Sequence, residues 1–150
     1  MVYFPPEIMN LIFEFHNPYW GLKDKMKKLH EYLDKENLKL SQGGIFTKDT
    51  KYYFNTDPMK DPISSIDYKN IAKCVNEIPN IFIPRKTLSI GSYGGKHRIE
   101  EYRKLHTPKE DNYISNGAFI SAMLLYGHKM RKEKENGNPN CNFYVSLKKK

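Results

Sequence analysis

The chain of 150 residues has few cysteines and lacks long apolar runs. The first shortage argues against a disulfide-rich protein and the second against a membrane-spanning one. Cys74 and Cys141 are its two cysteines, far apart and within apolar stretches, so we expect buried reduced thiols rather than a disulfide framework. No apolar run reaches the length of a membrane span. The N-terminus MVYFPPEIMNLIFEF also lacks the basic start and small-residue cleavage site of a signal peptide. We therefore expect a soluble protein in a cytosol-like, reducing compartment.

Alanine and arginine are scarce, with 3 and 4 residues, whereas Lys (21), Asn (13) and Ile (13) are abundant. Codons rich in A and T encode Lys, Asn and Ile, while Ala and most Arg codons need G and C. The composition therefore indicates an AT-rich genome, as found in many viruses and in some bacteria and protists.

Residue types that carry catalysis are present but scattered. His97 and Glu101 are four residues apart on a predicted helix, the spacing of a base and its carboxylate, yet no partnered nucleophile accompanies them. The histidines and cysteines show no zinc spacing, and the nearest approach is a set of His97, His106 and Cys141. We expect no enzyme, no catalytic residue, no metal and no cofactor.

The stretch GSYGG, before a predicted helix that carries Lys96, has a weak likeness to a phosphate-binding loop. It lacks the strand, the spacing and the Ser/Thr of a Walker motif. The alternatives are a helix N-terminus at Ser92 that receives one phosphate of a nucleic acid and a plain helix cap.

The net charge of +8 is unevenly distributed along the chain. Residues 1–84 carry 11 lysines and 11 acids, whereas residues 85–150 carry 14 Lys and Arg and 6 acids, so the second part holds the whole excess. All four arginines lie there. A localised basic region is typical of a polyanion binder, and guanidinium suits bidentate contacts with phosphate. The alternative is a solvated lysine surface without a partner.

Hydrophobic periodicity and turn signals predict a single compact α+β domain, mainly helical, with short hairpins that include a C-terminal β-hairpin. Helices are expected over residues 7–15, 19–40, 65–78, 93–105 and 115–126. A hairpin is expected over 44–54 with its turn near Asp49, and extended segments over 81–83, 127–131 and 141–147. Residues 1–84 form a helical and hairpin part, and 85–150 form a basic helix-loop-helix-hairpin module packed on the same core.

The order helix, loop, helix, hairpin is that of a winged helix, whose second helix enters the major groove. Here that helix, SNGAFISAMLLYG, is apolar nearly all round and should be buried. Contacts with nucleic acid should therefore come from the cations beside it, mostly to phosphate. The predicted nucleic-acid-binding residues are Lys96, Arg98, Arg103, Lys104, Lys129, Arg131 and Lys132.

Three ordered blocks, SYGGKHRIEEY, YISNGAFISAMLLYGHK and NPNCNFYVS, span Ser92–Ser146. They resemble a functionally uncharacterised module of large DNA viruses and some tailed phages, with the pattern SYxxKHxxE, YxSNGxFIxAxxxxG and PNxxF. The resemblance implies a viral protein, in the host cytoplasm or the virion, rather than an activity. Gly94-Gly95 stands where relatives often have a bulkier residue.

The N-terminal stretch FPPEIMNLIFEF resembles the opening of an F-box, whose first helix docks on a ubiquitin-ligase adaptor. The later F-box residues are missing, because Trp20 comes too early to be the usual tryptophan. An amphipathic helix after Pro5-Pro6 explains the same residues.

The leading hypothesis is a non-enzymatic viral protein, with a place in the virion left open, that binds DNA or RNA through its basic C-terminal part. The rival is an F-box-like protein–protein adaptor or a structural virion protein without nucleic-acid binding. A homodimer or another viral protein stays open as a further partner, and no membrane partner is expected. Asn116 is expected to cap the last helix or to bond a neighbouring loop, with Gly117 allowing close backbone packing.

Overall fold

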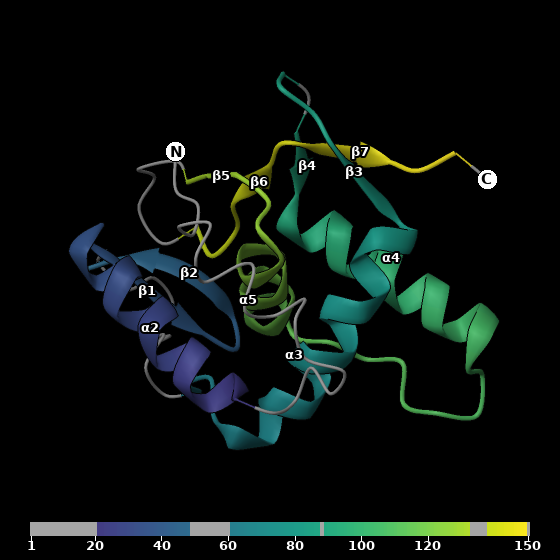
Figure 1. The fold of residues 1–150 in the computed structure, drawn as a ribbon, viewed down its shortest axis with the longest axis horizontal. Coiled ribbons are helices and arrows are strands. Elements are labelled where there is room, and N and C mark those ends of the chain that lie inside the picture. Colours follow the sequence, from purple (N-terminus) through teal and green to yellow (C-terminus); the bar gives the residue numbers. More distant parts are fainter. Residues whose placement is uncertain (1–20, 49–60, 88, 133–137, 150) are drawn as a thin grey trace.

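The computed structural model describes residues 21–48, 61–87, 89–132 and 138–149. The central element is helix α5 (Asn116–Tyr126), with the other elements arranged around it (Figure 1). Helix α2 (Leu22–Lys35) and the hairpin of β1 (Leu38–Ser41) and β2 (Gly44–Thr47) lie on one side, and helix α4 (Ser92–His106) lies on the other. Helix α3 (Ser65–Glu77) packs below, followed by a 3-10 turn at Ile78–Asn80. The prediction of a compact α+β domain is confirmed.

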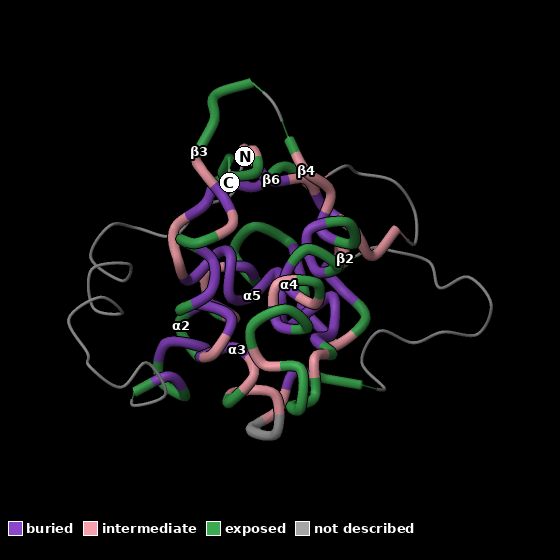
Figure 2. Tube along the Cα trace, turned by 90° about the vertical axis from the view of Figure 1, so that its right-hand side faces the viewer, coloured by how far each residue is buried: buried purple, intermediate pink, exposed green. Residues whose placement is uncertain are grey.

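Short strands cover the remaining side of α5. Strand β3 (Phe82–Pro84) pairs antiparallel with β7 (Val145–Leu147). Strand β6 (Asn142–Phe143) lies between β4 (Ile90–Gly91) and β5 (Met130–Arg131), and β5 with β6 forms the expected C-terminal hairpin. We call the residues 82–87, 89–91, 127–132 and 138–149 the strand layer. Both the ribbon and the burial view show this layer at the top of the molecule (Figures 1 and 2).

Local sequence explains the helix boundaries. Ser64 begins α3 as part of a capping box, in which its N–H donates to Asp67 Oδ2 at 2.9 Å. Ser115 begins α5, because its Oγ accepts from the N–H of Ala118 at 3.1 Å. Gly127 ends α5 in the left-handed conformation, with φ of 109°.

One hydrophobic core joins the two parts of the chain that differ in charge. It includes Leu29 and Ile71 from the neutral part and Phe119 and Val145 from the basic part, all fully buried or nearly so. The ring of Phe119 on α5 packs against Phe82 of β3, with centroids 5.9 Å apart, and edge-on against Phe143 of β6, at 6.0 Å. These aromatic contacts fix the strand layer on the central helix.

The second helix is shorter than predicted. It ends at Lys35 rather than Leu40, since Asn37 adopts a left-handed conformation with φ of 64° and the chain reverses into β1. Leu38 and Leu40 are buried on either side of exposed Lys39, which is a strand alternation. Leu40 alone also fits a helix, because it lies seven residues after Leu33. The predicted helix was therefore wrong at its C-terminal end.

The hairpin also differs from the prediction. Strand β2 pairs with β1 through a turn at Gln42-Gly43, with Leu40 opposite Ile45. The predicted turn at Asp49 and return strand lie outside the described residues, as does the predicted N-terminal helix with its F-box likeness. Tyr93, in the first turn of α4, is 57% exposed.

Candidate nucleic-acid interface

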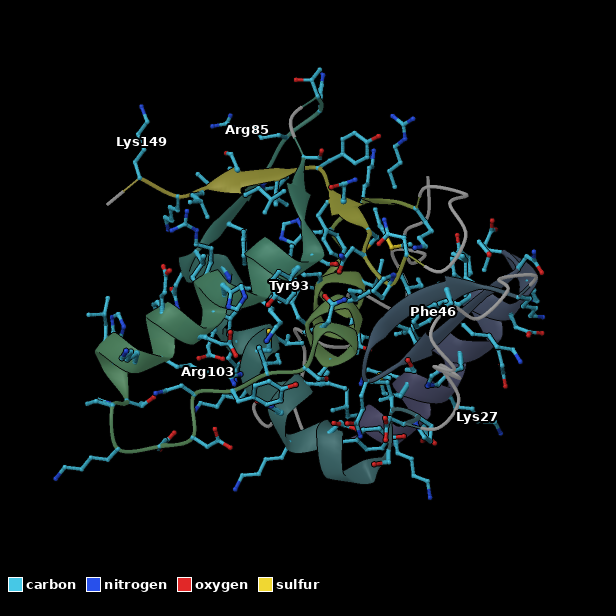
Figure 3. The ribbon with its side chains drawn as sticks, turned by 180° about the vertical axis from the view of Figure 1, so that it is seen from behind. Lys27, Phe46, Arg85, Tyr93, Arg103 and Lys149 are labelled. Carbon is cyan, nitrogen blue, oxygen red and sulfur yellow. The ribbon has the colours of Figure 1, made fainter. Side chains whose placement is uncertain are left out.

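Arg103 does not lie on the surface, where sequence reasoning expected it. It is 1% exposed, and its Nε donates to Glu77 Oε1 and Oε2 at 2.8 and 3.0 Å. Its Nη1 donates to Asn70 Oδ1 at 2.6 Å. Figure 3 shows the side chain directed from α4 toward α3. The guanidinium therefore joins two helices inside the protein, and its inclusion in a phosphate-binding surface was wrong.

Lys96 is also buried, with 7% of its surface exposed. Its Nζ donates to the carbonyl of Ile114 at 3.1 Å and lies 3.3 Å from a carboxylate oxygen of Glu100. The ammonium is 4.6 Å from the ring centroid of Tyr113 and 5.7 Å from that of Tyr93. These partners compensate the charge of Lys96, so this residue fixes the start of α5 against α4 and is not available to nucleic acid.

The remaining two predicted cations of α4 are exposed. Arg98 Nη1 pairs with Glu101 at 3.3 Å. His97 pairs with Glu100 at 2.9 Å, rather than with Glu101, which the spacing in the sequence had offered as a partner. Lys104 is exposed near the end of the helix. Two carboxylates on the same helix weaken the positive potential that Arg98 and Lys104 would offer to phosphate.

The three predicted cations near β5 lie in the strand layer. Lys129 and Arg131 are exposed on either side of buried Met130 and therefore lie on the outward face of the strand. Lys132 is half-buried, and its Nζ donates to the carbonyl oxygens of Asn138 and Asn140, the latter at 2.8 Å. Lys132 thus supports the layer, whereas Lys129 and Arg131 are exposed at its surface.

The strand layer combines many cations with no carboxylate among its described residues. Its cations are Arg85, Lys86, Lys129, Arg131, Lys132, Lys148 and Lys149. By contrast, the lysines of α2 alternate with Asp24, Glu31 and Asp34. The strand layer is therefore the face of the described chain on which positive charge is concentrated.

A row of three residues crosses the outward face of this layer at Tyr144. The N–H of Tyr144 donates to the carbonyl of Lys129 at 3.1 Å, and its own carbonyl accepts from the N–H of Arg85 at 2.7 Å. These bonds extend the β5–β6 and β3–β7 ladders, so the three residues are cross-strand neighbours on one face. Arg85 is held further by a bond from its Nε to Ser146 Oγ at 2.8 Å. A tyrosine is thus flanked by two cations.

The same row lines an open pocket of about 850 Å³. Its lining consists of Pro84, Arg85, Lys86, Tyr126, Gly127, His128, Lys129 and Tyr144. The rings of Tyr126 and His128 stack at a centroid distance of 5.0 Å and an interplanar angle of 23°. Tyr126 and Tyr144 are both half-buried. The pocket therefore brings together three aromatic rings and three cations.

His128 is the one buried histidine in this lining, with 3% of its surface exposed. Burial lowers the pKa of its imidazole to about 4, so the ring is neutral at pH 7. Its Nε2 is buried and has no hydrogen-bond partner among the residues that the structure describes. The imidazole therefore keeps one nitrogen unsatisfied beside the pocket.

Helix α4 does not expose an anion site at its N-terminus. Ser92 is fully buried, its N–H donates to the carbonyl of Cys141 at 2.8 Å, and its Oγ accepts from the N–H of Cys141 at 3.2 Å. The suggested phosphate site was therefore wrong, and Ser92 instead ties α4 to β6. Burial raises the pKa of the Cys141 thiol to about 12, which keeps that sulfur protonated and inert.

The residues Ser115-Asn116-Gly117 at the start of α5 are explained by packing. Asn116 Nδ2 donates to the carbonyl of Gly43 and to Asn140 Oδ1, both at 3.0 Å. A Cβ on Gly117 would lie 1.7 Å from the carbonyl oxygen of Ser41. The expected structural role of both residues is confirmed, because they join α5 to the β1–β2 turn and, through Asn140, to the chain before β6.

Sequence reasoning missed Arg85, Lys86, Tyr126, His128 and Tyr144 as members of one site. Tyr144 alternates with buried Phe143 and Val145, so the strand pattern already placed it on the outward face. The neighbours of Tyr144 could not be recognised, because Arg85 and Lys129 lie about 60 and 15 residues before it in the chain. One sequence does not show which residues of such distant strands are paired.

Within the described ranges, no helix is long and apolar enough to cross a membrane, and no group of three or more His, Cys, Asp or Glu could hold a metal ion. Comparison with protein-family models, curated proteins and solved structures finds no match to this chain.

Proposed function

We propose that this chain binds nucleic acid through its strand layer and catalyses no reaction. The observation that carries the proposal is the set of seven cations in this layer, with no carboxylate among its described residues, around a pocket lined by aromatic rings. The resemblance to a module of large DNA viruses supports a viral protein that acts in the host cytoplasm or the virion.

The physical basis is phosphate neutralisation. Each cation that contacts a phosphate releases condensed counterions, which favours binding and makes the affinity depend on salt. Arg85, Lys86, Lys129 and Arg131 are exposed along the outward face. Contacts of this kind supply affinity without base preference, so the proposed binding does not require a specific sequence.

The test replaces Arg85, Lys86, Lys129 and Arg131 with glutamine, which removes four charges and retains chain length. Binding to a labelled single strand and to a duplex is measured from about 50 to 200 mM salt. We expect weaker binding and a salt slope that is shallower by about 0.9 for each lost duplex contact and about 0.7 for each lost single-strand contact.

The matched control replaces Lys23, Lys27, Lys28 and Lys35 on α2, which are also exposed, with glutamine. Figure 3 shows Lys27 at the far end of the molecule from Arg85. This control has the same net charge as the first variant but should keep the wild-type salt slope. Equal effects of both variants would indicate a general charge effect and refute the assignment to the strand layer.

Wild-type protein that binds neither nucleic acid at low salt would eliminate the proposal. The rival function, a protein–protein adaptor or structural virion protein, would then take its place.

A further inference from the structure

The pocket in the strand layer has the chemistry of a site for an unpaired base. Tyr144 provides an aromatic ring between Arg85 and Lys129, which are its neighbours on the adjacent strands. Proteins that bind single strands combine aromatic stacking surfaces with cations that follow the phosphate backbone. Neighbouring strands are about 4.8 Å apart, so the backbones of Arg85 and Lys129 lie about 10 Å from each other across Tyr144.

The pocket is large enough for a nucleotide. Its volume of about 850 Å³ is within the range of sites for small organic ligands, and it is open to solvent. The bases of a duplex are covered on both faces by their neighbours, so a duplex would have to extrude a base before this pocket could receive it. A single strand offers its bases without that cost.

The lining of the pocket also holds a buried polar atom that lacks a partner. Most buried polar atoms in proteins have a hydrogen-bond partner, and an exception calls for an explanation. His128 Nε2 has none among the described residues, and the residue lines this pocket. A bound base, which carries donors and acceptors on its edges, can satisfy this buried nitrogen only after the imidazole ring turns toward the pocket.

We propose that this pocket receives one unpaired base of single-stranded DNA or RNA, stacked on the ring of Tyr144, with the adjacent phosphates contacted by Arg85 and Lys129. The inference rests on the proposed function and makes it narrower, because it assigns a preference for single strands and an aromatic contribution that is independent of charge.

The first test uses wild-type protein and three labelled probes of equal length: a single strand with bases, an abasic single strand and a blunt duplex. The single strand with bases should bind about tenfold more tightly than the abasic strand, since stacking of a base on an aromatic side chain contributes roughly 1–3 kcal/mol, which corresponds to 5- to 150-fold. Equal affinity for the two single strands would overturn the inference. Comparison of the affinities for DNA and RNA versions of the single strand shows which of the two nucleic acids supplies the base.

The second test uses Tyr144→Leu, which retains apolar volume but removes the flat ring. Single-strand affinity should fall about tenfold with an unchanged salt slope, while duplex affinity stays within about twofold and Tyr144→Phe retains wild-type binding. The matched control is Tyr93→Leu on α4, an exposed tyrosine outside the pocket, which should bind as the wild type does.

The outcomes separate the two proposals. Salt-dependent binding that does not distinguish base-bearing from abasic strands would retain the proposed function and refute the stacking site. Absence of any binding by the wild type would refute both.

Discussion

The buried ion pair between Arg103 and Glu77 is the strongest polar contact between α3 and α4. Taking both charges out of water costs free energy, which the bidentate geometry and the bond to Asn70 offset. Removal of one partner leaves the other charge buried without compensation. The ion pair therefore stabilises the fold only when both Arg103 and Glu77 are present.

For this reason we expect Arg103→Gln to lower the free energy of unfolding by about 3–5 kcal/mol. The double variant Arg103→Met/Glu77→Leu should recover most of that loss, because no unpaired charge remains. Urea unfolding of the wild type, Arg103→Met, Glu77→Leu and the double variant gives the coupling energy. A loss below about 1 kcal/mol for Arg103→Gln would contradict the buried geometry.

His128 makes stability depend on pH. Burial lowers the pKa of this histidine to about 4, compared with 6.5 in the unfolded chain, so the unfolded state binds more protons between these values. Stability is therefore complete above about pH 6.5 and falls as the pH approaches 4.

The expected loss through His128 between pH 7 and pH 5 is about 2 kcal/mol. The variant His128→Phe keeps a ring beside Tyr126 but cannot titrate. Urea unfolding at both pH values should show a smaller loss for this variant than for the wild type, by that amount. Equal losses would show that His128 is protonated in the folded protein at pH 5.

At the scale of elements, α5 is unusual because ten of its eleven residues are buried. Burial on all sides requires neighbours on all sides, and several approach at backbone distance. The N–H of Gly117 donates to the carbonyl of Gln42 at 2.9 Å, so the β1–β2 turn lies directly against the start of the helix. A side chain at position 117 would separate the two elements.

We expect Gly117→Ala to destabilise the protein by about 3 kcal/mol, because its Cβ would collide with the backbone of Ser41 and neither element can retreat without opening the core. The matched control is Gly94→Ala in α4, where a Cβ meets nothing within 4 Å. That change should stabilise the helix by about 0.5–1 kcal/mol. Thermal unfolding of both variants checks the opposite signs, and a loss of stability in both would contradict the local packing.

Elements whose pattern is set by local chemistry were predictable from the sequence. Helices α5 and α3 were predicted over 115–126 and 65–78, each within one residue of its observed bounds, because Ser115 and Ser64 mark their starts. The end of α2 was not recognised, because Leu33 and Leu40 are seven residues apart and fit a helix as well as the observed strand. Only the pairing of β1 with β2 distinguishes these alternatives.

At the scale of the whole molecule, the sequence located the charge in the correct part of the chain but not on the correct face. Lys96 and Arg103 counted as surface cations, although each is matched by a carboxylate inside the fold. Charge counting cannot distinguish a buried arginine from an exposed one, because burial depends on tertiary neighbours. The cations of the strand layer share one face because β3 pairs with β7, and the sequence does not show this pairing.

The complete burial of α5 has a consequence for synthesis of the chain on the ribosome. Strands β5 to β7, which cover one side of this helix, follow it in the sequence, and β7 ends at Leu147, 21 residues after Tyr126. At roughly 5–20 residues per second, the apolar helix exists for about one to four seconds before its cover has been made. During that interval α5 lacks its strand cover, although it has not yet left the ribosomal exit tunnel. The chain should therefore complete its core only after the last strands have emerged from the ribosome.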